Sequence, residues 1–461
     1  MASHGSRAAD DFPLRREPPP PAADGAAHRP HLAARLVDTP RPEHNRERSH
    51  HMYEPTATPA AHYGGGDRQS QLEHPAHGSV KQTKIIALYL PQFHTFPEND
   101  RWWGKGFTEW TNVRKAKSLF DGHHQPEVPL HQNYYNLLDA KTQIWQAELA
   151  QQYGIDGFCY YHYWFSGKLL MEKPMENMLA NQAIRQPFCI CWANENWTRN
   201  WDGEAQKVIM PQNYEEDEAA WEEHFRYLLP FFRDARYIKH NGCPVFIIYK
   251  PYLIKNIQAM TAYWRELAVK AGFPGIYLGY QFPATIESDA RLFFDFGMEF
   301  EPLYTSYLRS VHRKTLPSKL LYGSYHWPWL LGKLRKKFQL YFCGIPDIAD
   351  YDATWRDILA RQHDANMMPG AFTSWDNSPR RGKFGLIYYE ATPQKFRQYM
   401  MQALRQAQRD RKEFLFINAW NEWGEGAHLE PDEHNGYGYL EAVRDAVRSL
   451  QEHKMNAEGT D

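Results

Sequence analysis

The chain has 461 residues, and its 53 Lys and Arg nearly balance its 55 Asp and Glu, for a formal net charge of −2. This balance argues against a nucleic-acid-binding protein, and the absence of an apolar run of 18 residues argues against a membrane-spanning helix. Aromatic residues reach 15%, which is typical of a large core or of a cleft where flat rings stack. Five Cys without a CxxC spacing favour a reducing compartment, so we expect a cytoplasmic protein.

The first 80 residues differ in composition from the rest of the chain. They contain no Trp, Cys or Ile and are rich in Ala, His, Arg and Pro. Such a segment cannot bury enough apolar surface to offset its chain entropy. We therefore predict a disordered tail at 1–80, one globular domain at 81–452 and a flexible C-terminus at 453–461.

The globular part begins at Lys84 and alternates short apolar runs with amphipathic helical patterns. Strands are predicted at 85–90, 157–162, 188–192, 245–249, 275–280, 297–301, 370–374 and 414–419. Helices are predicted at 139–153, 175–184, 216–229, 257–271, 351–362, 393–409 and 439–452. Eight such units predict a (β/α)8 TIM barrel of the α/β class. The alternative is an open doubly wound sheet, but the first strand lacks GxGxxG and the chain has no Walker A string.

Polar and aromatic residues gather where the predicted strands end, and in a barrel these ends share the functional face. Trp and Tyr offer flat surfaces for the apolar faces of sugar rings, and Asn, Glu, Asp and His offer partners for hydroxyls. The plain alternative is that the aromatic residues only cap the barrel. The candidate substrate-binding residues are Tyr89, His94, Trp110, His162, Trp164, Trp192, Asn194, Glu195, Trp197, Glu299, Glu301, Trp375, Asp376, Trp420, Asn421 and Trp423.

The candidate catalytic residues are Glu422 and Glu425, which follow the last predicted strand. Two carboxylates that flank a glycosidic bond are the usual equipment for its cleavage, one as acid and the other as base or nucleophile. Repulsion between close carboxylates raises the pKa of one of them and so favours this division. Gly424 and Gly426 allow a tight turn here.

Five segments resemble the WbsX family of bacterial surface-polysaccharide and O-antigen proteins, which is related to glycoside hydrolase family 99, the endo-α-mannosidases. The resemblance covers roughly residues 84 to 450, and its segments are 89–94, 106–113, 157–165, 192–197 and 418–431. It implies a carbohydrate-active enzyme without a cofactor, whose partner is a polysaccharide or oligosaccharide.

The resemblance also implies roles for the two glutamates. Glu422 would be the base that deprotonates the sugar's own 2-hydroxyl, which attacks the anomeric carbon to form a 1,2-anhydro sugar. Glu425 would be the acid that protonates the leaving oxygen. This chemistry requires a manno-configured sugar such as mannose or D-rhamnose. The hydrolases typically carry His where this chain has Gly424.

Other residues carry weaker signals. Glu109 is a further candidate ligand or acid. His94 and His162 with Glu195 have no tight metal-ligand spacing, so we expect no metal. The string Asp350-Tyr351-Asp352 matches the DxD of nucleotide-sugar transferases, but it opens a predicted helix, where Asp is a favoured cap.

An insertion is predicted at about 303–345, after the sixth strand. Its segment 309–337 holds eight Lys or Arg, no acid and several aromatic residues. A helical lid is the plain interpretation, and peripheral membrane contact is the alternative.

Three functions remain open. The first is a retaining glycosidase or transglycosidase, the second is a glycosyltransferase that uses a nucleotide sugar, and the third is a non-catalytic polysaccharide-binding protein. Two intact glutamates count against the third, and the absence of a phosphate-binding loop counts against the second.

Overall fold

A computed structural model describes residues 82–199, 204–282, 289–315 and 346–458. The predicted tail at 1–80, most of the basic insertion and the last three residues lie outside these ranges. All of the described residues belong to one compact unit.

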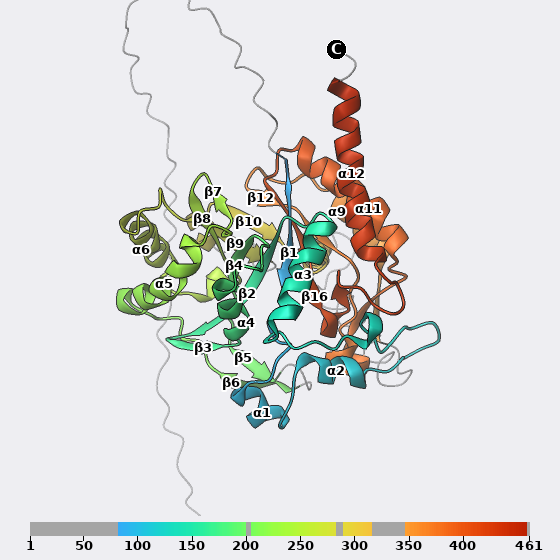
Figure 1. Cartoon of the computed structure of the whole chain (residues 1–461), viewed down its shortest axis with the longest axis horizontal. Helices are drawn as coiled ribbons and strands as arrows, with labels where there is room; N and C mark the ends of the chain where they lie inside the picture. Colours follow the sequence, from blue (N-terminus) through green and yellow to red (C-terminus); the bar gives the residue numbers. More distant parts are fainter. Residues whose placement is uncertain (1–81, 200–203, 283–288, 316–345, 459–461) are drawn as a thin grey trace, which may run out of the picture. The chain divides into compact units, whose positions relative to one another are not determined.

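Parallel strands form the centre of the fold, and they match the eight predicted strands (Figure 1). They are nearly continuous apolar runs because both of their faces are covered. Their order around the sheet is β12-β10-β9-β8-β4-β2-β1-β15-β13. The bounds are β1 Lys84–Tyr89, β2 Gly157–Phe165, β4 Phe188–Trp192, β8 Cys243–Ile248, β9 Tyr277–Phe282, β10 Phe296–Glu299, β12 Met367–Met368, β13 Gly370–Phe372 and β15 Phe414–Asn418.

The short strands β12 and β13 together take the place of the seventh barrel strand and close the sheet. Only Pro369 separates β12 from β13, and β12 pairs with β10 while β13 pairs with β15. A Cβ atom at Gly370 would lie 1.9 Å from the backbone oxygen of Glu299, so glycine permits this close approach. The result is a nearly closed parallel barrel, as predicted, rather than an open doubly wound sheet.

Helices surround the strands at the predicted positions, and neighbours in sequence such as α5 and α6, or α11 and α12, lie side by side (Figure 1). The last helix continues to Glu458, beyond its predicted end at Glu452. The bounds are α1 Pro97–Trp103, α2 Glu109–Lys115, α3 Ala140–Gln152, α4 Lys173–Ala180, α5 Glu218–Arg233, α6 Ile257–Lys270, α7 Leu303–Thr315, α9 Tyr351–Ala360, α10 Ser378–Arg381, α11 Pro393–Arg409 and α12 Gly438–Glu458. Of the predicted insertion, the structure describes α7.

The loops contain additional short strands, and several of these lie near the ends of the barrel strands. They are β3 Lys168–Leu170, β5 Trp197–Arg199, β6 Glu204–Met210, β7 Lys239–His240, β11 Asp347–Asp350, β14 Leu386–Tyr389, β16 Asn421–Glu422 and β17 Ala427–His428. The antiparallel pair β16–β17 carries the predicted catalytic turn.

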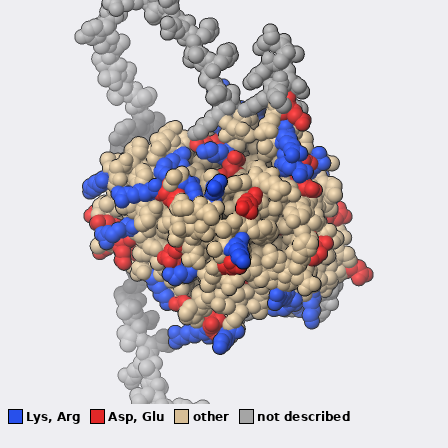
Figure 2. Space-filling view, viewed as in Figure 1, with Lys and Arg blue, Asp and Glu red and all other residues tan. Residues whose placement is uncertain are grey.

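The surface mixes charges of both signs. Lys and Arg alternate with Asp and Glu over the visible face of the described residues (Figure 2). Within those residues, no helix is both long enough and apolar enough to cross a membrane.

Candidate active site

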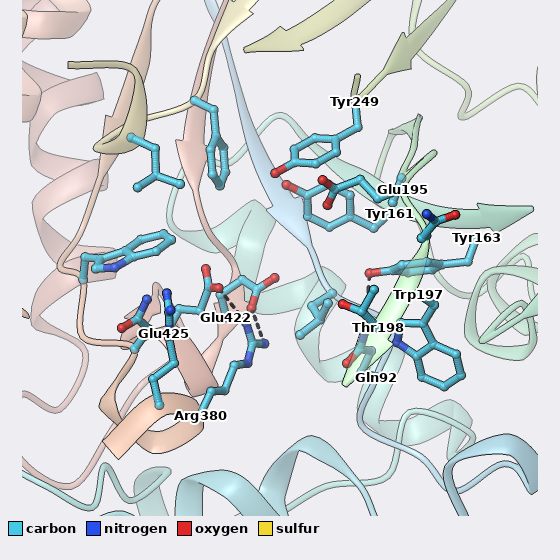
Figure 3. Close-up of a pocket in the computed structure, with 18 of the residues that line it drawn as sticks. Gln92, Tyr161, Tyr163, Glu195, Trp197, Thr198, Tyr249, Arg380, Glu422 and Glu425 are labelled. Atoms are coloured by element: carbon cyan, nitrogen blue, oxygen red, sulfur yellow. Dashed lines mark hydrogen bonds and ion pairs between the residues drawn. The ribbon is translucent and has the colours of Figure 1, made fainter. Parts of the chain in front are cut away.

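A cavity of about 410 Å³ opens at the ends of the barrel strands. Figure 3 shows two opposed walls: Glu422, Glu425 and Arg380 form one, and tyrosines with Glu195 and Trp197 form the other. Charged groups that face aromatic rings across a concave site are typical of pockets for polar organic ligands. The full lining is Leu90, Gln92, Tyr161, Tyr163, Phe165, Ala193, Glu195, Asn196, Trp197, Thr198, Tyr249, Phe300, Leu303, Trp375, Asn377, Arg380, Arg381, Leu386, Glu422 and Glu425.

Arg380 connects three carboxylates, of which Glu109 and Glu422 are buried and Glu425 is partly exposed. Its Nη2 donates to Oε2 of Glu422 at 2.9 Å, and its Nη1 donates to Oε1 of Glu425 at 2.7 Å. Its Nε donates to Oε1 of Glu109 at 2.7 Å. The Arg380 side chain is 11% exposed, so these pairs are largely screened from water. One cation thus faces three acidic groups, and the cluster retains an excess of negative charge or binds protons.

Burial decides the protonation of this cluster. It raises the pKa of Glu422 to about 8, against a lowering effect of Arg380 and a further raising effect of Glu425 and Glu109. Burial also raises the pKa of Glu425, again opposed by Arg380. The two glutamates interact strongly, so their protons belong to the pair rather than to either residue. Near neutral pH this pair can hold a proton and offer an acid and a base together.

The turn between β15 and β17 is fixed by the neighbouring strand ends. The side-chain amide of Asn421 both accepts from the Leu90 backbone N–H, at 2.7 Å, and donates to the Leu90 carbonyl, at 3.0 Å. Gly426 then adopts a φ of +58°, where a side chain would be strained, and the Glu425 carbonyl accepts from the N–H of Asp376 at 2.6 Å. These contacts fix the backbone that carries both candidate catalytic side chains, Glu422 and Glu425.

Five of the sequence-predicted residues line this cavity: Glu195, Trp197, Trp375, Glu422 and Glu425. Glu195 forms an ion pair with Lys250 at the end of β8. The other predicted residues lie close by in the fold, but their side chains contact protein groups instead.

Four of them face the helices outside the barrel or the core. His162 contacts His224 of α5, with 3.0 Å between the two Nε2 atoms, and Trp164 stacks on the same His224 ring. Trp192 donates its indole N–H to the Trp164 carbonyl at 3.2 Å. His94 is 2% exposed, and burial lowers its pKa to about 4. Burial likewise keeps His162 neutral, with a pKa of about 3.

A second group surrounds the buried carboxylate of Glu430. Trp423 donates to Oε2 of Glu430 at 2.7 Å, and Gln146 donates to its Oε1 at 2.6 Å. Tyr89 in turn donates to Gln146 at 2.7 Å. The Trp110 ring lies 5.4 Å from that of Trp423, and Asn421 donates to the Tyr135 hydroxyl, which itself donates to Glu430. Trp420 is fully buried and packs on Phe158. The expected substrate contact of these residues is thus replaced by a structural role.

The remaining predicted residues are held by other partners. Arg361 donates to Glu299 at 2.6 Å and to Glu301 at 2.9 Å, so these two acidic groups at the end of β10 share one cation. Asn194 exchanges two hydrogen bonds with the backbone of Lys250. Asp376 accepts from His123 or pairs with it at 2.7 Å, and it lines a different cavity.

The sequence did not predict several lining residues, because it does not reveal which alternate side chains of a strand face the cavity. On β2 the alternate residues Tyr161, Tyr163 and Phe165 line the cavity, whereas the predicted His162 and Trp164 face the opposite side. Both sets are aromatic, so composition does not reveal which set faces inward. Arg380 had no sequence signal beyond its place after the seventh strand, and Tyr249 ends the fourth.

The DxD string has the structural role that its position favours. Asp350 is the N-cap of α9, and its side chain accepts from the backbone N–H of Ala353 at 2.8 Å. Asp352 pairs with Lys395 at 2.9 Å. Neither residue lines the cavity of Glu422 and Glu425.

Comparisons with solved structures find distant neighbours. A GH99 endo-α-mannosidase from Bacteroides thetaiotaomicron shares 12% identity and a TM-score of 0.48, over 81% of this chain and 98% of that chain. A GH113 β-1,4-mannanase shares 9% identity and a TM-score of 0.34, over 68% of this chain and 94% of that chain.

Curated relatives are closer in sequence. The uncharacterized protein WxcX from two strains of Xanthomonas campestris pv. campestris is 35% identical over 368 residues, which is 79% of this chain. The chain spans about half the length of these relatives, 49%. The family model described as "Glycosyltransferase WbsX" matches residues 85–443. The chain therefore belongs to the WbsX family.

Proposed function

We propose that this protein is a carbohydrate-active enzyme that cleaves or transfers α-linked, manno-configured units of a bacterial surface polysaccharide. The observation that carries the proposal is the placement of Glu422 and Glu425 in one cavity, joined through Arg380 and faced by an aromatic wall. An acid–base pair opposite stacking surfaces is the arrangement that glycoside chemistry requires.

The proposed reaction has two steps. Glu422 takes the proton of the sugar 2-hydroxyl, O2 attacks the anomeric carbon, and the bond to the leaving oxygen breaks as Glu425 protonates that oxygen. Water, or an acceptor hydroxyl, then opens the 1,2-anhydro sugar by the reverse proton transfers. Water gives hydrolysis and an acceptor sugar gives transfer, both with retention of configuration.

The protonation that burial favours for Glu422 differs from its proposed role. Burial raises the pKa of Glu422 to about 8, which favours its protonated form at pH 7, although the mechanism uses it as a base. We keep the assignment because the pair shares its protons, and because the Glu425 side chain is the more exposed of the two, 21% against 10%. The variants below decide between the two assignments.

Transfer from a nucleotide sugar is the second candidate, and the description of the matching family favours it. In that reaction the acid–base pair would activate an acceptor hydroxyl rather than cleave a polymer. The cavity offers Arg380 and Arg381 as partners for a diphosphate. However, Arg380 already pairs with three carboxylates.

The test combines polymers, aryl glycosides and two isosteric variants. We expect the parent to release products from an α-mannan or α-D-rhamnan without a nucleotide sugar, and Glu422→Gln and Glu425→Gln to lower this rate by at least a hundredfold. An aryl α-mannoside needs little protonation of its leaving group. It should therefore restore turnover to the acid variant, Glu425→Gln, and not to Glu422→Gln.

Other outcomes would change the proposal. Rescue of Glu422→Gln instead would reverse the two roles. Product formation only in the presence of a nucleotide sugar would establish the transferase. Binding of polymers with equal affinity by parent and variants, without any turnover, would leave a binding protein.

A further inference from the structure

A second cavity, of about 220 Å³, adjoins the turn that carries Glu422 and Glu425. Trp375 lines both cavities, and Gly426 and His428, within three residues of Glu425, line the second one. His123, His124, Glu127, Asp376 and His434 contribute further groups to its wall. This collection of imidazoles and carboxylates plays no part in the proposed glycoside chemistry.

Two side chains that line this cavity, Glu127 and His428, converge with a third, Asp432. Glu127, His428 and Asp432 each place one potential ligand atom within 4.8 Å of the other two. His428 and Asp432 are 3% and 1% exposed. Oε2 of Glu127 is shielded from solvent and lacks a hydrogen-bond partner among the described residues. The carboxylates of Glu127 and Asp432 repel each other at this separation, and a bound cation would offset that repulsion. The nearby His124 places its Nε2 3.7 Å from Oε2 of Glu127, but an imidazole carries positive charge only when it is protonated.

The contacts of His428 define which of its nitrogens is available. Its Nδ1 lies 3.0 Å from the carbonyl oxygen of Glu430, which only accepts, so Nδ1 carries the hydrogen and Nε2 carries the lone pair. The ring also lies on the indole of Trp423, with centroids 3.7 Å apart, which fixes its plane. A histidine that donates one N–H to a backbone carbonyl and presents the other nitrogen is the usual form of a metal ligand.

We propose that Glu127, His428 and Asp432 bind a divalent transition-metal ion of the Zn²⁺ class, and that this ion fixes the turn that carries Glu422 and Glu425. One imidazole and two carboxylates suit Zn²⁺ or Mn²⁺, whereas Ca²⁺ and Mg²⁺ prefer oxygen ligands only. His124 and His434, whose rings stack 4.1 Å apart, line the same cavity and offer a fourth ligand. The proposal departs from the expectation of no metal, and it does not depend on the proposed function.

The link to the catalytic turn is direct. His428 pairs with Asn421 across β16–β17, and its ring contacts Trp423, which stands between the two glutamates in sequence. An ion held by His428 would therefore restrict both ends of the turn. Glu127 and Asp432 come from separate loops, so the ion would also join these loops to the barrel.

The experiment uses the full chain, stripped with EDTA and desalted, and titrated with ZnCl₂ by calorimetry. We expect one site with a dissociation constant below about 1 µM in the parent. The melting temperature of the protein should rise by about 4 °C when the free Zn²⁺ concentration is a hundredfold above this dissociation constant. MgCl₂ should give neither effect.

Two isosteric variants locate the site. Glu127→Gln and Asp432→Asn should each weaken this binding at least thirtyfold and remove the thermal shift. Glu127→Gln should not lower the melting temperature of the stripped protein, because it removes one of the repelling carboxylates. Glu390→Gln is the matched control: Glu390 lines the same cavity but lies outside the cluster, so binding should persist.

The histidines of the first 80 residues, such as His50 and His51, provide a competing source of zinc binding. Their contribution is the same in all variants, so the difference between parent and Glu127→Gln isolates the cluster. Equal binding by parent, Glu127→Gln and Asp432→Asn, or no binding at all, would overturn the proposal.

Discussion

A Cβ atom added to Gly424 would lie 1.8 Å from Oε1 of Glu109 and 2.7 Å from Nε of Arg380. The ion pair between Glu109 and Arg380 therefore fills the space that a side chain at position 424 would need. The same Arg380 also donates to Glu422 and Glu425, so this ion pair is part of the electrostatic environment of the candidate acid and base.

Gly424→Ala tests this packing. The methyl group must displace Glu109 or Arg380, so we expect a loss of about 1–3 kcal/mol in the free energy of unfolding and at least a tenfold loss of activity. Urea denaturation and the polymer assay measure the two effects. Gly275→Ala is the control, because its Cβ would meet only Sγ of Cys243, at an ordinary 3.6 Å. Parent-like stability of Gly424→Ala would show that the pair moves aside freely.

Arg380→Met tests the cation that the three carboxylates share. Removal of one partner of a buried pair leaves uncompensated charge and costs about 3–5 kcal/mol. Arg380 lowers the pKa of Glu422 and Glu425, so its loss raises both, and the acidic limb of the pH–rate profile should move to higher pH. The stability deficit should shrink towards pH 5, where protonation removes the unpaired charge. Arg226→Met is the control, because Arg226 is an exposed residue of α5 outside the cavity and should leave the profile nearly unchanged.

Glu422 makes the parent less stable as the pH rises. The pKa of Glu422 is near its ordinary value of 4.5 in the unfolded chain and about 8 in the folded protein, so the folded state holds a proton that the unfolded state releases between these values. Stability should therefore fall by on the order of 3 kcal/mol between pH 4.5 and pH 7 from this group alone. Denaturation series at several pH values should show a weaker slope for Glu422→Gln. An unchanged slope would contradict the raised pKa, and Glu390→Gln serves as an exposed control.

Tyr249→Phe and Tyr89→Phe compare a tyrosine that lines the cavity with one that lies in the core. Tyr249 lines the cavity, so loss of its hydroxyl should raise KM by about 3–10-fold, which corresponds to one hydrogen bond. Tyr89 donates to Gln146 within the core, so its loss should leave KM unchanged and lower stability by about 1–3 kcal/mol. The reverse pattern would place Tyr89 in the binding site, as its strand-end position first indicated. Steady-state kinetics and urea denaturation on the same preparations measure both quantities.

The sequence alone determined the barrel and the place of the turn that carries the candidate catalytic glutamates. Strands such as 85–90 and 414–419 are buried on both faces, so they are continuous apolar runs that the local sequence is sufficient to predict. The motif that contains Glu422 and Glu425 is likewise local, because its two carboxylates and two glycines lie within six residues of Asn421.

Only the tertiary structure decided which strand-end side chains face the cavity. Tyr161 and His162 are adjacent and equally suited to a sugar site, but one step along a strand reverses the side of the sheet. Arg380 and Glu109 are 271 residues apart in sequence, and they meet at the glutamates because separate loops converge at the end of the barrel. The same convergence places Glu127 beside His428. Interactions across such distances follow from the closure of the barrel, which no local pattern encodes.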